Sequence, residues 1–173
     1  MEELNKREAV SGLARIPLLL SLLCRVFEDD GTQFPERSGE IYSRVLRGLL
    51  KTWRREKGAE ATDVDVELTL GKVSAAAFEV FPASQFGETE FAKHATGDAA
   101  ELVRTLLRDG ILIRAGADQD APLMFLHRTF HEYLAARHLS GQAWNQKRVE
   151  GWCSYFQSSL SPSSFARLRY NIR

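Results

Sequence analysis

Residues 110–126 read GILIRAGADQDAPLMFL, and this stretch decides the fold class. Two β-prone runs, 111–114 and 123–126, flank a turn that contains Gly, Asp and Pro, which predicts a β-hairpin. Helical spacing over 98–109 precedes the hairpin, and Gly110 suits the end of that helix. A helix, a glycine and a hairpin in this order form the second half of a winged helix.

Apolar residues at helical spacing continue upstream of this stretch. They predict helices after Pro17, after Pro35 and after Thr62, which can cap its own helix, while Pro82 ends that third helix. A shorter helix is expected over 88–95. The apolar positions expected to face a core are Leu18, Leu19, Leu22, Leu23, Val26, Phe27, Ile41, Tyr42, Val45, Leu46, Leu49, Leu50, Trp53, Val66, Leu70, Val73, Ala77, Val80, Phe81, Leu102, Val103, Leu106 and Leu107.

Downstream of the hairpin, Thr129 and Glu132 have the spacing of a capping box and predict a helix through Leu139. The expected fold is therefore mainly α in three parts. A small helical domain occupies residues 1–60, and a winged-helix domain with one β-hairpin occupies 61–140. Residues 141–173 are expected to begin a helical scaffold.

The composition favours a globular protein without a strongly charged surface. The chain has 173 residues, 44% of them hydrophobic, and Lys plus Arg equals Asp plus Glu at 23 each, so no global charge attracts nucleic acid or anionic lipid. The apolar run 16–24 is too short for a bilayer span, and the N-terminus lacks a secretory signal, so we expect a cytoplasmic protein. Cys24 and Cys153 follow no metal-ligand spacing and are interpreted as packing residues.

Three segments resemble the NACHT family of signal-transducing ATPases. They are IPLLLSLLC at 16–24, FPERSGEIY at 34–42 and FLHRTFHEYLAA at 125–136. Their order, and their separation by a winged-helix pattern, are similar to the family over roughly residues 10–140.

The resemblance implies a nucleotide-gated switch of defence-like signalling. In such proteins a P-loop domain is followed by a small helical domain, a winged-helix domain and a helical scaffold. By this resemblance, Pro17 would lie against the adenine of ATP or ADP, and His127 would bond to the β-phosphate of ADP in a closed, inactive state. The implied partner is the P-loop domain of the parent protein, with homo-oligomers on activation.

The sequence departs from the family in one large respect. A P-loop requires Gly-x-x-x-x-Gly-Lys-Ser/Thr, so that backbone amides surround the phosphates. The only Gly-Lys pair is Gly71-Lys72, with Val73 after it and Val66 where the first Gly should be. We therefore expect a regulatory fragment that has no catalytic residue and is not an enzyme on its own.

Other interpretations stay open. Pro17 could simply start a helix, and His127 could be an ordinary histidine at a strand end. A metal site at His131, Glu132 and His138 is disfavoured by their spacing. A DNA-binding winged helix would use the helix over 98–109, whose two arginines face three acidic residues. The chain could also be a structural remnant of a split gene.

Overall fold

The structure, a computed structural model, describes residues 16–30, 38–56, 62–95 and 97–141. The chain divides into two compact units, Met1–Ala61 and Thr62–Arg173, next to the domain boundary expected between residues 60 and 61. The described part is mainly helical with one two-stranded antiparallel sheet, which confirms the expected fold class. Apart from Gly141, the expected scaffold region 141–173 lies outside the described residues.

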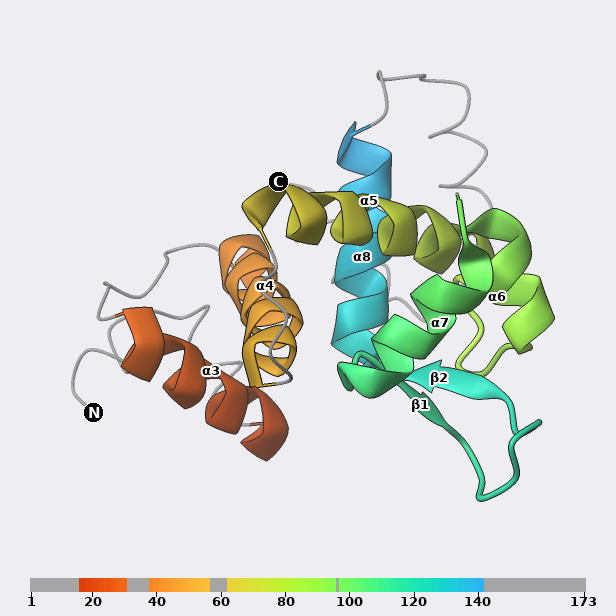
Figure 1. Cartoon of the computed structure of the whole chain (residues 1–173), viewed down its shortest axis with the longest axis horizontal. Coiled ribbons are helices and arrows are strands. Elements are labelled where there is room, and N and C mark those ends of the chain that lie inside the picture. The colour runs from red at the N-terminus through yellow and green to blue at the C-terminus, as the bar shows by residue number, and fades with distance from the viewer. Residues whose placement is uncertain (1–15, 31–37, 57–61, 96, 142–173) are drawn as a thin grey trace, which may run out of the picture. The chain divides into compact units, whose positions relative to one another are not determined.

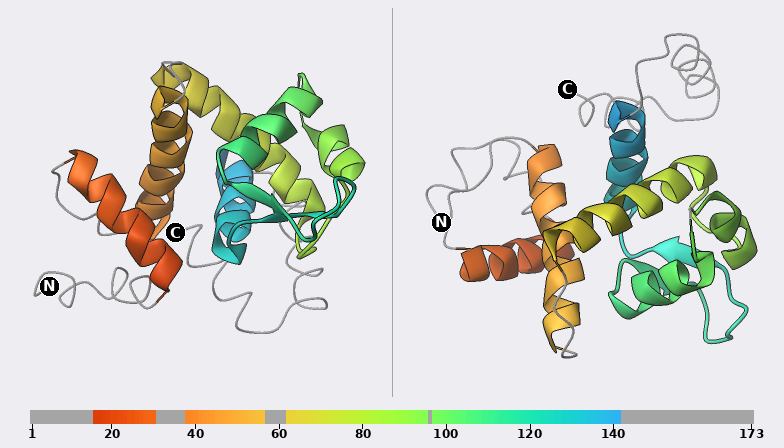
Figure 2. Two further views of the ribbon diagram at one scale, coloured as in Figure 1. Left: turned by 60° about the horizontal axis from the view of Figure 1, so that its bottom comes forward. Right: turned by 45° about the horizontal axis from the view of Figure 1, so that its top comes forward.

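The first unit contains α3 (Pro17–Asp30) and α4 (Ser38–Glu56), which pack against each other (Figure 2). Helix α3 begins at the expected proline, because the Leu20 N–H already bonds to the Ile16 carbonyl at 2.9 Å. A proline in the first turn lacks only an N–H that would have no partner within the helix.

The apolar stripes predicted for these two helices are largely confirmed. The buried side chains are Leu19, Leu23, Ile41, Tyr42, Val45, Leu46 and Leu50. Leu18, Leu22 and Leu49 are partly exposed, and the side chains of Val26, Phe27 and Trp53 lie outside the described residues. Cys24 is exposed, so its interpretation as a packing residue was wrong. It lies on α3 beside the buried Leu23, one helical step of about 100° away.

The second unit contains α5 (Asp63–Val80), α6 (Glu88–His94), α7 (Ala99–Arg108), β1 (Leu112–Arg114), β2 (Leu123–Phe125) and α8 (Arg128–Gly141) (Figure 1). The predicted cap of α5 is present and reciprocal. The Thr62 hydroxyl accepts the Asp65 N–H, and the Asp65 carboxylate accepts the Thr62 N–H, both at 3.2 Å. This exchange satisfies donors that the first turn leaves without helical partners.

The hairpin forms as predicted, and Gly110 sets it up. Gly110 has φ +69°, and its N–H bonds to the Leu107 carbonyl while the Ile111 N–H bonds to the Leu106 carbonyl. These two bonds form a Schellman motif, which ends α7 and turns the chain into β1. The strands pair with Leu112 opposite Phe125, and the loop between them extends away from the helices of its unit (Figure 1).

A third strand position was missed by the sequence analysis. Phe86, between α5 and α6, forms an antiparallel bridge with Leu123 through two backbone bonds of 2.9 and 2.8 Å. The unit therefore runs helix, bridge, helix, helix and hairpin, which is the order of a winged helix. A single bridging residue has no periodic pattern, so the sequence carried no signal for it.

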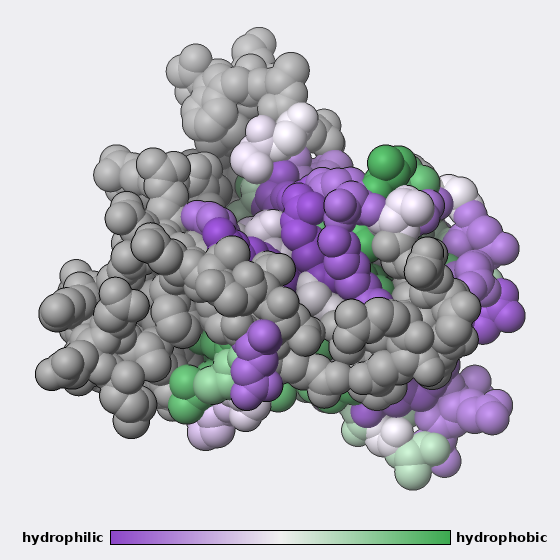
Figure 3. All heavy atoms as spheres, turned by 60° about the vertical axis from the view of Figure 1, so that its left-hand side comes forward, coloured by the Kyte–Doolittle hydropathy of each residue, from purple (hydrophilic) through white to green (hydrophobic). Residues whose placement is uncertain are grey.

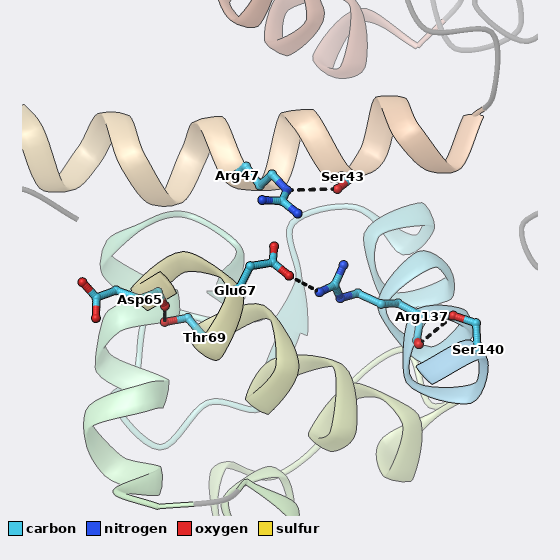
Figure 4. Close-up of polar contacts among 7 residues, drawn as sticks. All are labelled: Ser43, Arg47, Asp65, Glu67, Thr69, Arg137 and Ser140. Atoms are coloured by element: carbon cyan, nitrogen blue, oxygen red, sulfur yellow. Dashed lines mark hydrogen bonds and ion pairs between the residues drawn. The ribbon is translucent and has the colours of Figure 1, made fainter. Parts of the chain in front are cut away.

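Helix α8 crosses α5 and makes the most extensive helix contact of this unit (Figure 1). All residues from Thr129 to Ala136 are buried, so α8 is buried on every side over this stretch. Toward its end, Arg137 bonds to Glu67 of α5 at 2.8 Å (Figure 4). The predicted core positions of α5 are buried, as are those of α7 except the partly exposed Leu107.

Among the residues that are coloured on the face drawn in Figure 3, hydrophilic ones are more prominent and hydrophobic ones form small patches. Val64 and Leu68 on α5 are exposed at 75% and 59%. Within the described ranges, no helix combines the length and apolar character needed to cross a bilayer.

Two glycines provide a matched test of this fold. Gly71 lies inside α5 with open space where a Cβ would be, whereas Gly110 has a left-handed backbone. We expect Gly71→Ala to raise the free energy of unfolding by about 0.5–1 kcal/mol through helix propensity. Gly110→Ala should lower it by about 1–2 kcal/mol through backbone strain. Urea unfolding measures both changes. If the two substitutions changed the free energy of unfolding in the same direction, the backbone conformations assigned to Gly71 and Gly110 would be contradicted.

The β2–α8 junction as a candidate functional site

The candidate site lies where β2 ends and α8 begins. The Leu126 N–H bonds to the Ile111 carbonyl at 2.9 Å, which holds the end of β2 beside the start of β1. The Phe130 N–H bonds to the His127 carbonyl at 3.0 Å. His127 is therefore the residue that enters α8, and its side chain is partly exposed.

The His127 ring caps α8. Its Nδ1 accepts the Thr129 N–H at 3.2 Å and lies 2.7 Å from the Thr129 hydroxyl. Because an N–H can only donate, Nδ1 carries no proton, and a neutral ring holds its proton on Nε2. The ring nitrogen thus does what a Ser or Asp oxygen does at most helix starts.

This cap corrects the predicted capping box. Helix α8 begins at Arg128, so Thr129 lies within its first turn and does not precede it. Glu132 accepts a bond from Arg128 Nε at 3.1 Å, with the carboxylate 2% exposed and the guanidinium 59% exposed. The Thr-x-x-Glu spacing is therefore present in the sequence, but the helix is capped two residues earlier, by His127 in place of Thr129.

The arrangement can bind an anion. The Nε2–H of His127 is a donor on the opposite side of the ring from Nδ1, and the N-terminus of α8 contributes partial positive charge. The exposed guanidinium of Arg128 follows directly in the chain. A phosphate oxygen is the type of acceptor that such donors suit.

His131 lies one turn further along α8 and is buried. Its Nε2 donates to the Ala77 carbonyl of α5 at 2.8 Å. The ring stacks on Phe125 of β2 with centroids 4.5 Å apart, and its edge contacts Phe81 at 5.1 Å. In the sequence, His131 was a candidate only for metal binding, whereas its contacts in the structure join α8 to α5 and β2.

Burial sets the charge state of His131. Loss of hydration is the main cause that lowers its pKa from 6.5 to about 4; the bond to Ala77 opposes this shift and the nearby Arg128 adds to it. A neutral ring also fits the contacts, since its donor faces a carbonyl and its faces meet phenyl rings.

Pro17 lies in the other unit. It is the exposed first residue of α3, and its carbonyl accepts a bond from the Ser21 hydroxyl at 2.9 Å. Both predicted nucleotide contacts are thus at helix starts, Pro17 in the first unit and His127 in the second.

Two further sequence patterns have clear structural positions. Gly71 and Lys72 lie in the interior of α5, so the only Gly-Lys pair is helical and not a phosphate-binding loop. Among the described residues, no group of three His, Cys, Asp or Glu side chains has a metal-binding arrangement. The ring of His138 instead packs 5.0 Å from that of Phe78.

Comparison with known proteins identifies no family. Neither a scan against protein-family models nor a search of curated proteins found a match to this chain. The NACHT resemblance therefore rests on the three sequence segments themselves.

The buried His131 predicts a pH dependence of stability. Because its pKa in the folded state is lower than in the unfolded state, the unfolded chain binds more protons between about pH 6.5 and 4. The free energy of unfolding should therefore decrease by roughly 3 kcal/mol as the pH falls through this window. Urea unfolding across the window measures this loss.

Substitution separates His131 from the other titrating groups. His131→Gln keeps a donor for Ala77 but cannot titrate, so its pH dependence should be flatter than that of the natural protein. His94→Gln, on the exposed end of α6, serves as the matched control and should leave the curve unchanged. An unaltered slope in His131→Gln would contradict the assignment.

Proposed function

We propose that this chain is the regulatory part of a nucleotide-gated signalling switch of NACHT type. It would detect whether a P-loop domain holds ADP or ATP and would have no catalytic role. The observation that carries this proposal is the orientation of His127, whose capping contact places its proton on Nε2. That proton is the donor a diphosphate would need.

In the proposed closed state, His127 donates to the β-phosphate of ADP and the exposed ring of Pro17 packs on adenine. Support for Pro17 comes from its exposure and its missing N–H, since a compact, rigid apolar ring can cover a base without leaving a donor unsatisfied. Exchange of ADP for ATP would break the His127 contact and let the winged-helix unit move outward, exposing surfaces for self-assembly.

The strength of this contact limits its role. A hydrogen bond to a charged phosphate contributes about 1.5–3 kcal/mol. Reversing a population from 1:99 to 99:1 needs about 5.5 kcal/mol of differential binding. His127 would therefore act as a latch, with the remainder supplied by contacts of the P-loop domain with both units.

The phosphate loop must come from the P-loop domain, because the sequence has no complete P-loop motif and Gly71-Lys72 is helical. ATP or ADP would thus be bound only jointly with that domain. The proposal places the complex in the cytoplasm.

Loss of the latch should speed ADP release. In the parent protein that joins this chain to its P-loop domain, His127→Ala should raise the ADP dissociation rate roughly 10- to 150-fold, the equivalent of the lost bond. Release of a fluorescent ADP analogue measures this rate. His94→Ala is the control, and an unchanged rate in His127→Ala would return His127 to a purely structural role.

The isolated chain should not bind nucleotide tightly. Calorimetric titration with Mg-ADP should give a dissociation constant no better than about 100 μM, because a few donors without a phosphate loop contribute little net affinity. Submicromolar affinity would contradict a purely regulatory role.

DNA binding should also be absent. The arginines of α7 and β1 are paired with carboxylates: Arg104 with Glu101 at 2.9 Å, Arg108 with Asp109 at 2.9 Å and Arg114 with Glu88 at 2.7 Å. A phosphate backbone would have to displace these partners. A mobility-shift assay at physiological salt should show no retained complex, and a stable one would favour the DNA-binding alternative.

A further inference from the structure

We propose that His131 is a positioning residue that holds His127 in the orientation that a phosphate requires. This inference rests on the proposed function for the identity of the ligand. The positioning itself concerns only contacts within the second unit and can be measured without nucleotide.

The spacing of the two histidines makes the coupling direct. His127 directly precedes α8 and His131 lies in its first turn, so only one helical turn of chain separates the two histidines. Any rotation or shift of the first turn of α8 therefore moves both. The capping bond ties His127 to Thr129 of that turn, and His131 connects the same turn to α5 and β2.

The bond to α5 has a specific backbone partner. At the end of α5, the Phe81 N–H bonds to the Phe78 carbonyl and not to the Ala77 carbonyl, as a further α-helical turn would require. The Ala77 carbonyl accepts from His131 instead. A buried carbonyl strongly favours a partner, so this bond fixes where the first turn of α8 lies along α5.

The stack on Phe125 fixes the other side of the junction. Phe125 is held by Phe86 and Phe91, with ring centroids 5.6 and 6.2 Å away. Its ring and that of His131 are within 22° of parallel. The stack thus closes the short loop 125–131, with His127 inside it, and limits the directions that the His127 ring can take.

Loss of the His131 contacts should disturb the cap made by His127. If the first turn of α8 can shift, the hydrogen bond from the Thr129 N–H to His127 Nδ1 is weakened, and the Nε2–H of His127 loses its fixed direction. Helices α5 and α8 also pack together through other buried residues, and both Leu134 of α8 and Val73 of α5 lie at 0% exposure. The junction should therefore change before the unit unfolds.

The test follows the His127 ring in the purified full chain by imidazole ¹H–¹⁵N correlation spectra, together with hydrogen exchange of the Thr129 amide. His131→Phe keeps a ring for the stack but removes the donor to Ala77. In this variant the His127 Nδ1 signal should move toward that of the exposed His94, and protection of the Thr129 amide should fall by at least about tenfold.

Two variants complete the comparison. His131→Gln restores a donor and should return the His127 signals toward their natural positions, while His138→Gln, further along α8, should leave them unchanged. Natural His127 signals in a folded His131→Phe would overturn the proposal. Should that variant not fold, His131→Leu, which removes both the donor and the ring, takes its place: displaced His127 signals support the proposal, and natural signals overturn it.

A second arm separates this inference from the proposed function. In the parent protein, His131→Phe should speed ADP release, and adding it to His127→Ala should have little further effect because both act through one contact. If the spectra show the displacement but neither variant alters ADP release, the positioning stands and the proposed function fails. If His127→Ala speeds release but His131→Phe leaves His127 in place, the inference fails alone.

Discussion

The hydrogen bond from the buried imidazole of His131 to the Ala77 carbonyl is the contact on which the β2–α8 junction depends. It joins residues that are 54 positions apart and meets the need of a carbonyl at the end of a helix. The stack on Phe125 extends the same connection to the hairpin. Three elements thus meet at one neutral ring, and the entry to α8, where His127 lies, is built on it.

Much of this fold could be predicted from the sequence because its signals are local. Thr62 with Asp65 marks a helix start, Gly110 marks a helix end, and apolar spacing marks the buried sides of α5 and α7. The start of α8 was placed wrongly, because Thr129 and Glu132 imitate a capping box while a histidine ring makes the cap. The bridge at Phe86 depends on Leu123, a distant partner that no local pattern reveals.

The candidate site likewise has features that the sequence indicates and features that depend on contacts formed only in the folded chain. The resemblance pointed to Pro17 and His127 as residues, and both lie at helix starts with accessible side chains. The direction of the His127 ring could not be predicted, because it follows from a bond to the Thr129 amide that exists only once α8 begins at Arg128. The contacts of His131 were equally hidden, since they require α5 and β2 to be packed in place.

The charge state of His131 offers the most direct test of this account. A neutral ring bonded through Nε2 to Ala77 should give the ¹⁵N signals of an Nε2–H tautomer, with a slowly exchanging proton, down to about pH 5.5. Imidazole ¹H–¹⁵N spectra recorded against pH measure this property. Persistence of that signal after exposed histidines have become charged is the predicted result. A protonated His131 at about pH 6, or a rapidly exchanging Nε2 proton, would contradict the buried connection between α5, β2 and α8.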